Sequence, residues 1–212
     1  MYHIHNSYHN AIHAADVAQM MYYMLVICDG RDIFNINKEI FMALILACAG
    51  HDVDHPGHNN HYEMKTRSTL AIVYNDKSVL ENHHCATTFK IASNHESAIF
   101  DDMEVQSQKT VREWIIQMIL ATDMSLHFSK LAELKNRLDS GEPDLMDKDR
   151  GTALENIIHA CDIGNPARPR EVALEWTFRI LDEFFSQGDK ERNANLEITM
   201  LCDRYTTNVS KS

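Results

Sequence analysis

The feature that most constrains this chain is the spacing of its apolar residues, which recur at helical intervals and nowhere in a convincing strand alternation. Residues 9–28 show the pattern, in one broad apolar stripe made of Ile12, Val17, Met20, Met21, Met24 and Leu25. A second helix is expected at 38–49, with Asn37 as its N-cap and Gly50 at its end. The same spacing predicts further helices at 66–75, 79–95, 109–123, 126–138, 150–161 and 169–187.

The remaining segments are expected to be connections. Pro56 and Gly57 exclude a regular helix at 51–58, and the stretches 96–108 and 140–147 are polar. Only 7 Gly and 4 Pro leave little material for the turns of a β-sandwich or barrel. The sequence therefore predicts an all-α fold in which residues 1–212 form one compact multi-helix domain.

Charge and cysteine usage limit the classes of protein that fit. The net charge of -11 argues against a nucleic-acid-binding surface, because phosphate contacts require a basic face. No apolar run reaches the roughly 20 residues that cross a bilayer, and the first residues lack the apolar segment of a signal peptide. The five cysteines form no CxxC pair, which favours free buried thiols over a disulfide frame. We therefore expect a soluble, intracellular, cytoplasmic protein without a transmembrane segment, whose oligomeric state the sequence leaves open.

Histidine is unusually frequent, and eight of the 13 histidines precede Glu63. His9 and His13 are four residues apart on a predicted helix, so both project from one face. This spacing suits a metal site, or one metal ligand beside one acid–base group, but surface histidines also reach it. The pair alone leaves its role open.

A denser group follows the apolar run at 41–49. His51, Asp52, Asp54 and His55 offer four potential ligands within five residues. Burying an adjacent imidazole and carboxylate costs free energy unless a cation or another partner compensates. A solvated polar loop is the alternative, but the apolar helix that leads into the group favours a metal site.

Other carboxylates stand at predicted helix ends. The apolar helix at 150–161 leads directly into Asp162, in the same way. Glu81 lies near the start of the helix at 79–95, where an acidic side chain could merely complement the helix dipole. Thr122 and Asp123 end another helix and could serve only to cap the next one.

Six segments occur in a fixed order along the chain: YHNAIHAADV (8–17), HDVDHPGHNN (51–60), SVLENHH (78–84), ATDMS (121–125), HACDIGNP (159–166) and EFFSQGD (183–189). They resemble the sequence blocks of the class I cyclic nucleotide phosphodiesterases, including YHNxxHAxDV and HDxxHxGxxN. Because the six blocks cover nearly the whole chain, the resemblance implies the all-α, HD-type fold of that family's catalytic domain.

The resemblance also implies two divalent metal ions. A tight ion, usually Zn²⁺, would be held by His13, His51, Asp52 and Asp162, a mixed nitrogen and oxygen set that suits zinc. Asp52 would also bridge to a second ion, usually Mg²⁺ or Mn²⁺, which is otherwise bound largely by water. The side chains implied to hold those water molecules are His55, Glu81 and Thr122.

The implied reaction is metal-dependent hydrolysis of a 3′,5′-cyclic nucleotide, cAMP or cGMP, to its 5′-monophosphate, which ends a cyclic nucleotide signal. His9 would protonate the departing O3′, a role that suits a group with a pKa near 6.5. Tyr8, Met124 and Asn165 would contact the substrate. A non-catalytic metal- or nucleotide-binding domain of the same fold and another HD-superfamily phosphohydrolase stay as alternatives, since both can share the ligand set.

The chain also departs from the family pattern. Only seven residues precede Tyr8, where the family has several helices. The sequence ends at Ser212, where the family places a purine-binding glutamine and, further on, a base-stacking phenylalanine. We therefore expect a truncated catalytic domain with a complete metal site and an incomplete base pocket. Its preference between cAMP and cGMP stays open, and weak hydrolysis is expected from these residues alone.

Overall fold

A computed structural model of the chain describes residues 1–141 and 143–208, and every regular element among them is helical. The longer helices are α1 (Ala11–Tyr22), α3 (Lys38–Gly50), α6 (Val79–Ala92), α7 (Val105–Leu120), α8 (His127–Asp139), α9 (Arg150–Asp162) and α10 (Arg170–Asn193). The shorter elements are η1 (Tyr23–Ile27), α2 (Gly30–Ile33), α4 (Asn60–Lys65), α5 (Thr69–Val73), η2 (Met124–Leu126) and η3 (Asn165–Ala167). The all-α prediction is confirmed. Residue 142 of the expected 140–147 connection, and the chain end at 209–212 on which the expected base-pocket gap depends, lie outside this description.

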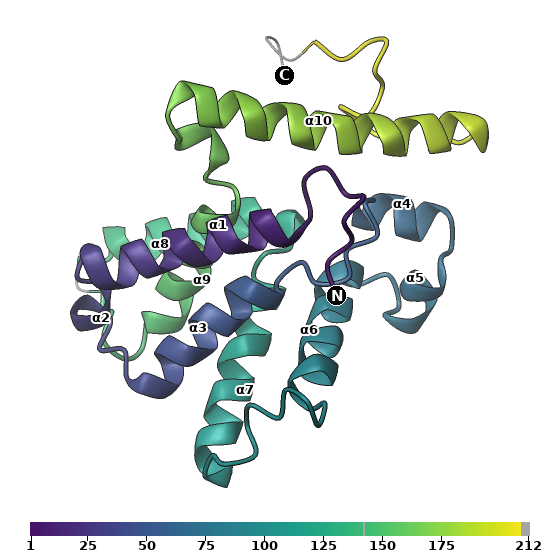
Figure 1. Ribbon diagram of the computed structural model, residues 1–212. Helices are drawn as coiled ribbons and strands as arrows, with labels where there is room; N and C mark the ends of the chain where they lie inside the picture. Colours follow the sequence, from purple (N-terminus) through teal and green to yellow (C-terminus); the bar gives the residue numbers. More distant parts are fainter. Residues whose placement is uncertain (142, 209–212) are drawn as a thin grey trace.

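The helices pack around a core shared by α1, α3, α7 and α9. α3 packs against α1 and α7, and α9 packs against α1 and α8. Figure 1 shows α10 lying across the top of the other helices, reached from α9 through η3, with α4 and α5 at one side near α6. The fully buried core includes Val17, Met21, Leu44, Ala47, Ile115, Met118, Ile119, Leu154 and Ile158.

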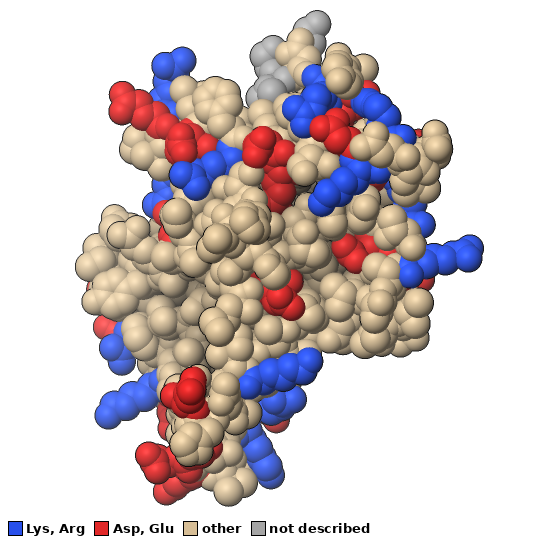
Figure 2. Space-filling view, turned by 45° about the vertical axis from the view of Figure 1, so that its right-hand side comes forward, with Lys and Arg blue, Asp and Glu red and all other residues tan. Residues whose placement is uncertain are grey.

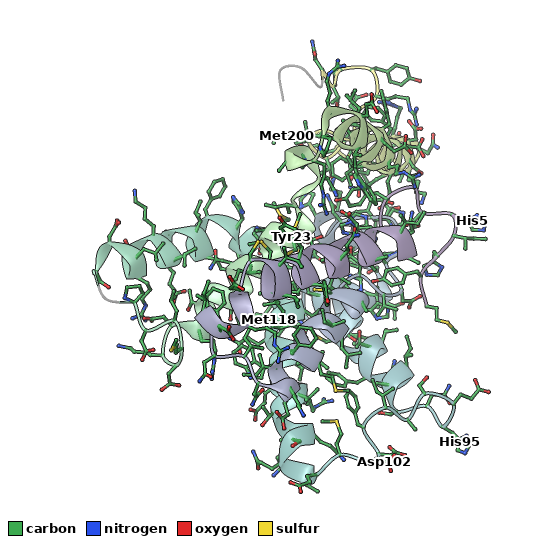
Figure 3. The ribbon with its side chains drawn as sticks, turned by 60° about the vertical axis from the view of Figure 1, so that its left-hand side comes forward. His5, Tyr23, His95, Asp102, Met118 and Met200 are labelled. Carbon is green, nitrogen blue, oxygen red and sulfur yellow. The ribbon has the colours of Figure 1, made fainter. Side chains whose placement is uncertain are left out.

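Figure 3 places Met118 of α7 inside this core, whereas His5, His95 and Asp102 lie on outer segments. His5 and His95 are exposed, so two of the many histidines lie outside the interior. The number of histidines by itself therefore does not show which of them belong to a functional site.

Side-chain caps begin the two helices that lead into the histidine segments. Asn10 accepts hydrogen bonds from the backbone N–H groups of Ile12 and His13 at 2.9 and 3.4 Å, which fixes the start of α1. Asn37 accepts from the N–H of Ile40 at 2.9 Å, as expected for the N-cap of α3. These caps place His13 in the first turn of α1 and His51 directly after α3.

Several expected boundaries are wrong. The helix at 9–28 is α-helical only to Tyr22 and continues as the wider π-helix η1. Its stripe is also narrower than expected, because Ile12 and Met24 are 58% and 36% exposed while Val17, Met21 and Leu25 are buried. After η1 ends at Ile27, Gly30 begins the short helix α2, which was not expected.

Segment 51–58 is non-helical as expected, but two helices include residues for which no helix was expected. α4 forms after Pro56 and Gly57 because Asn59 caps it, accepting from the N–H of Tyr62 at 2.9 Å. α7 begins at Val105 rather than at 109, so only the first part of the 96–108 connection is non-helical. The predicted helix at 66–75 is shorter, spanning Thr69–Val73. Helix termini depend on single polar contacts, which periodicity does not report.

The cysteines, the helix composition and the charged surface bear on the protein classes considered above. All five cysteines are free, and all but Cys28 are buried. None of the described helices has the combination of length and apolarity that a membrane-spanning helix requires. On the face seen in Figure 2, Lys and Arg side chains lie among Asp and Glu rather than in one continuous basic patch. The predicted absence of nucleic-acid binding stays a prediction.

Candidate active site

The predicted ligands come from helix ends that meet near one point. His13 lies in the first turn of α1, His51 and Asp52 follow α3, and Asp162 is the last residue of α9. Their ligand atoms all lie within 4.8 Å of one another. Packing of α1 on both α3 and α9 brings these distant residues together.

The distances within this four-residue cluster are short. Nε2 of His13 lies 2.9 Å from Oδ1 of Asp162 and 3.4 Å from Oδ2 of Asp52. Nε2 of His51 lies 3.0 Å from Oδ2 of Asp52 and 3.2 Å from Oδ1 of Asp162. The two Nε2 atoms are 3.3 Å apart. Two imidazole nitrogens and two carboxylate oxygens therefore face a common centre.

The tautomer of His51 tests whether this donor set fits a cation. Nδ1 of His51 donates a hydrogen bond to the carbonyl oxygen of Cys48 at 2.8 Å, because a carbonyl can only accept. Neutral His51 then directs the lone pair of Nε2 at the carboxylate oxygens, an arrangement that repels unless a proton or a cation lies between them. Without an ion the proton is favoured: burial opposes it, but Asp52 and Asp162 outweigh burial and raise the pKa of His51 well above its ordinary value.

The two carboxylates stay ionised for the same reason. Burial tends to raise the pKa of Asp52 and of Asp162, but the positive charge of His51 and hydrogen bonds from the histidines hold both pKa values well below the ordinary range. An ionised carboxylate is the form that binds a metal ion. The cluster thus has the composition and the charge of a divalent cation site.

Asp52 also faces a second group of side chains. Ligand atoms of Asp52, His55 and His84 lie within 4.8 Å of one another. Nδ1 of His84 donates to the carbonyl oxygen of Val53 at 2.8 Å, and its Nε2 lies 3.8 Å from Oδ1 of Asp52. Burial lowers the pKa of His84 to about 4, so this imidazole is neutral near pH 7. His84 has no role in the sequence-based prediction, although it lies in the SVLENHH segment.

Glu81 and Thr122 lie in the same region. Asn60 donates from Nδ2 to both carboxylate oxygens of Glu81, at 3.1 and 2.9 Å. Burial raises the pKa of Glu81 to about 7. The hydroxyl of Thr122 donates to the carbonyl oxygen of Ile119 at 2.8 Å, which leaves its oxygen free to accept. Asn60 is the last residue of HDVDHPGHNN, but the motif alone does not reveal its contact with Glu81.

His9 is positioned by Glu183 of α10. Nδ1 of His9 donates to Oε1 of Glu183, while the backbone N–H groups of Tyr8 and His9 donate to Oε2 at 3.0 and 3.1 Å. The His9 ring stacks on that of His55, with centroids 3.8 Å apart. Burial tends to lower the pKa of His9, but Asp52, Glu183 and Asp162 outweigh it and raise that pKa.

Most of the predicted site residues line one cavity of about 380 Å³, within the range of small-molecule sites. Its walls include His9, Asp52, His55, Glu81, Thr122, Met124, Asp162 and Glu183. Met124 is 57% exposed, as a residue at the mouth of a site would be. His13 and His51 are fully buried behind the wall.

Tyr8 and Asn165 are placed differently. Both are buried, and the hydroxyl of Tyr8 donates to Oδ1 of Asn165. Nδ2 of Asn165 donates to Oδ2 of Asp16 at 3.3 Å. The two side chains thus bond to each other beside the cavity, and neither is among its lining residues. Their predicted contact with substrate stays a prediction.

The chain is similar to known cyclic nucleotide phosphodiesterases. Residues 8–212 match the sequence profile described as 3′5′-cyclic nucleotide phosphodiesterase. The chain is 43% identical to rat (Rattus norvegicus) 3′,5′-cyclic-AMP phosphodiesterase 4C, covering 100% of this chain and 40% of that protein. It is 42% identical to the mouse (Mus musculus) protein of the same name, covering 100% of this chain and 32% of that one. The Drosophila melanogaster 3′,5′-cyclic-AMP phosphodiesterase, isoform F, is 40% identical over 98% of this chain and 32% of its own length. The chain therefore belongs to the 3′5′-cyclic nucleotide phosphodiesterase family.

Proposed function

We propose that this protein is a metal-dependent phosphodiesterase that hydrolyses a 3′,5′-cyclic nucleotide to its 5′-monophosphate and so ends a cyclic nucleotide signal. The observation that carries the proposal is the meeting of His13, His51, Asp52 and Asp162 around one centre, next to a cavity lined by His9. The relatives are named for cyclic AMP, which makes cyclic AMP the first substrate to test and cyclic GMP the second.

The metal roles follow from the donor atoms. His13, His51, Asp52 and Asp162 would hold the tight ion, for which Zn²⁺ suits the mixed nitrogen and oxygen set. Asp52 would share the second ion, Mg²⁺ or Mn²⁺, with water molecules held by His55, Glu81 and Thr122. When bound, the two ions would activate water near neutral pH and stabilise negative charge on the phosphate.

His9 would donate the proton that the departing O3′ needs. Its Nδ1 is occupied by Glu183, so Nε2 is the atom that can reach the substrate. Glu183 also favours the protonated ring, which is the form that a general acid requires. Tyr8, Asn165 and Met124 would assist substrate binding, the first two through the shape of the region beside the cavity and Met124 at its mouth.

We also propose that residues 1–212 belong to one catalytic domain, because the helices that carry the site share one hydrophobic core. The chain spans 40% or less of the curated relatives named above. The activity of a longer chain should therefore be compared with that of these residues. Weak turnover here and strong turnover in the longer chain would support an incomplete base pocket.

The test is hydrolysis of cyclic AMP, cyclic GMP and a generic phosphodiester, each with and without a chelator. Metal-dependent formation of 5′-AMP or 5′-GMP, abolished by Asp162→Asn, is expected. Turnover of the generic ester alone would point to another HD-superfamily phosphohydrolase. Tight metal binding without turnover, even in the longer chain, would point to a non-catalytic domain and overturn the proposal.

A further inference from the structure

Ser78 occupies a strained position at the start of α6. Its φ and ψ are 40° and 53°, in the left-handed region that non-glycine residues seldom occupy. Asn75 and Asp76, just before it, also have positive φ values of 54° and 59°. Left-handed residues grouped beside a cavity need contacts that hold them there.

Asp123 supplies that contact for Ser78. The Ser78 hydroxyl donates to Oδ2 of Asp123 at 2.7 Å. The other oxygen of Asp123 accepts from the backbone N–H of Ser125 at 2.8 Å, which caps η2. Asp123 is only 5% exposed. One buried carboxylate therefore joins the start of α6 to the turn that follows α7.

The joined segments carry two of the proposed water-holding residues. Glu81 lies three residues after Ser78 in the first turn of α6, and Thr122 directly precedes Asp123. All four side chains line the same cavity. On the other side, Asn60 holds the start of α6 by accepting from the N–H of Leu80 at 2.9 Å and donating to Glu81. The Ser78–Asp123 hydrogen bond therefore links the segment that carries Glu81 to the segment that carries Thr122.

We propose that Ser78 and Asp123 are positioning residues that set the separation of Glu81 and Thr122 across the second metal position. The inference rests on the proposed function, because it assigns the purpose of the bond to that ion. Neither residue touches the substrate or the ion in this proposal. They act through the backbone of α6 and of the 122–125 turn.

Ser78→Gly is the decisive variant. Glycine tolerates a positive φ, so this change removes the hydroxyl while relieving the backbone. The folded state should be as stable as the wild type, and a change in metal affinity could not come from unfolding. Ser78→Ala removes the same hydroxyl but keeps the strained backbone, so it should also unfold more easily. Asp123→Asn keeps the shape of the side chain and the cap on the N–H of Ser125. Its loss of Mn²⁺ affinity should therefore be smaller than that of Asp123→Ala.

The matched control is Ser107→Ala. The Ser107 hydroxyl donates to Oε1 of Glu39 at 3.4 Å and joins α7 to α3 in the same chemical way. Neither residue lines the cavity. Its removal should leave metal binding unchanged.

The measurement is Mn²⁺ binding to the zinc-loaded protein, followed by electron paramagnetic resonance of free Mn²⁺, with thermal unfolding alongside. Ser78→Gly should weaken Mn²⁺ binding by about tenfold, the lower end of what outer-shell partners of a metal contribute. Zinc content should not change, and kcat should recover at saturating Mn²⁺. The double variant Ser78→Gly with Asp123→Ala should lose no more Mn²⁺ affinity than Asp123→Ala alone, because both changes remove the same hydrogen bond.

Unchanged Mn²⁺ affinity in Ser78→Gly, with two ions bound by the wild type, would overturn the inference and leave the proposed function intact. A wild type that binds no second ion would overturn both. Conversely, a wild type that binds two ions without hydrolysing a cyclic nucleotide would overturn only the proposed function, and a weakened second ion in Ser78→Gly would still support the positioning role.

Discussion

At the scale of single residues, neighbouring groups hold the four proposed ligands so that their donor atoms face one centre. The carbonyl oxygen of Cys48 fixes the tautomer of His51, and the Trp176 ring packs 5.8 Å from that of His13. Oδ1 of Asp162 lies 2.9 Å from Nε2 of His13 and 3.2 Å from Nε2 of His51. The site therefore depends on charge as well as on geometry.

Asp162→Asn should remove the metal while keeping the shape of the side chain. An amide is a weak metal ligand, so we expect metal affinity to fall by at least about 100-fold, the most that outer-shell partners contribute. Metal content by mass spectrometry checks this. The control is Asp54→Asn, which removes the same charge from a carboxylate that binds His3 and His83, each at 2.8 Å, and lies outside the cluster. A metal content unchanged in Asp162→Asn would contradict the ligand role.

Glu183→Gln should affect proton donation without affecting metal. Glu183 is one of the groups that raise the pKa of His9, so its loss lowers that pKa. A general acid must be protonated, and activity falls as pH rises through its pKa. The alkaline limb of kcat/KM should therefore move to lower pH, with kcat reduced about 10- to 100-fold, less than loss of a general acid itself.

The matched control for that change is Glu175→Gln, on the same helix but with an exposed ion pair to Arg179. It should leave the pH profile unchanged. A Glu183→Gln profile with an unmoved alkaline limb would remove Glu183 from the positioning of His9.

The apolar helices that lead into them point to His51, Asp52 and Asp162, whereas His9 and His13 receive their predicted roles only through the resemblance of the sequence blocks. Sequence reasoning assigned no role to Glu183, His84 or Asn60, although all three lie in the quoted segments. Glu183 contacts His9 across 174 residues of chain, and spacing along one helix holds no record of such a contact. The sequence predicts donors better than the groups that orient them.

At the scale of elements, the C-terminal half of α10 packs closely against the segment that follows it. Gly188 lets the segment after α10 run close to the helix: a Cβ there would lie 1.9 Å from the carbonyl oxygen of Cys202. The absent side chain is what allows the two backbones to touch.

Gly188→Ala should therefore destabilise the protein by about 1–3 kcal/mol, the usual cost of overpacking, in spite of the better helix propensity of alanine. Urea unfolding measures it. Gly151→Ala in α9 is the matched control, because its Cβ would meet only the end of the flexible Gln117 side chain at 2.9 Å. That variant should be neutral or stabilising. Equal effects of the two changes would rule out the close approach as the cause.

Glu191 also connects α10 to the segment that follows it, through hydrogen bonds. Its buried carboxylate accepts from Lys65 at 3.1 Å and from the Thr199 backbone and hydroxyl at 2.7 and 2.6 Å, joining α4, α10 and the following segment. Burial opposes ionisation, but the bonds from Thr199, Lys65 and Gln187 prevail and lower the pKa of Glu191.

Glu191→Gln should consequently lose stability in a pH-dependent way. A lowered pKa means that the stabilisation is complete above the ordinary glutamate pKa and is lost as pH falls through the lower folded value. We expect the free energy of unfolding of the wild type to exceed that of the variant by about 1.5–3 kcal/mol near pH 7, the range for hydrogen bonds to a charged group, and the difference to shrink in acid. Urea unfolding from pH 7 down to pH 3 checks this. A gap that does not change with pH would show that the charge is not involved.

At the scale of the whole molecule, the cluster connects parts of the chain that are far apart in sequence. His13 and Asp162 are separated by 149 residues, and His51 and Asp162 by 111. An ion bound there would tie α1, the segment after α3 and α9 to one point. Binding to the folded state alone would raise global stability.

Zinc should therefore raise the unfolding temperature of the whole chain. At a free concentration 100 times the dissociation constant the gain is about 2.7 kcal/mol, and a chelator should remove it. Calorimetry with and without chelator measures the shift, and Asp162→Asn should show none. A zinc-dependent shift that persists in that variant would place the ion elsewhere.

The all-α architecture and most helix positions could be predicted from the sequence, because helical periodicity is a local property of the chain. α3 was placed within one residue, since a long apolar run and an Asn cap agree there. α4 was missed because a single side-chain cap from Asn59 decides it after Pro56 and Gly57. The intracellular location stays a prediction.

Because the proposed ligands lie at or near helix ends, the chain should tolerate insertions and deletions at some positions far better than at others. One residue inserted within α9 would turn Asp162 by about 100° around the helix axis and carry it away from His13 and His51. The same insertion directly before Gly141, an exposed residue at which a side chain would meet nothing within 4 Å, should leave the register of α9 unchanged. Natural insertions and deletions in related chains should therefore occur mainly in the connections. The helices that carry the proposed ligands should keep their lengths, while the connections between them vary in length.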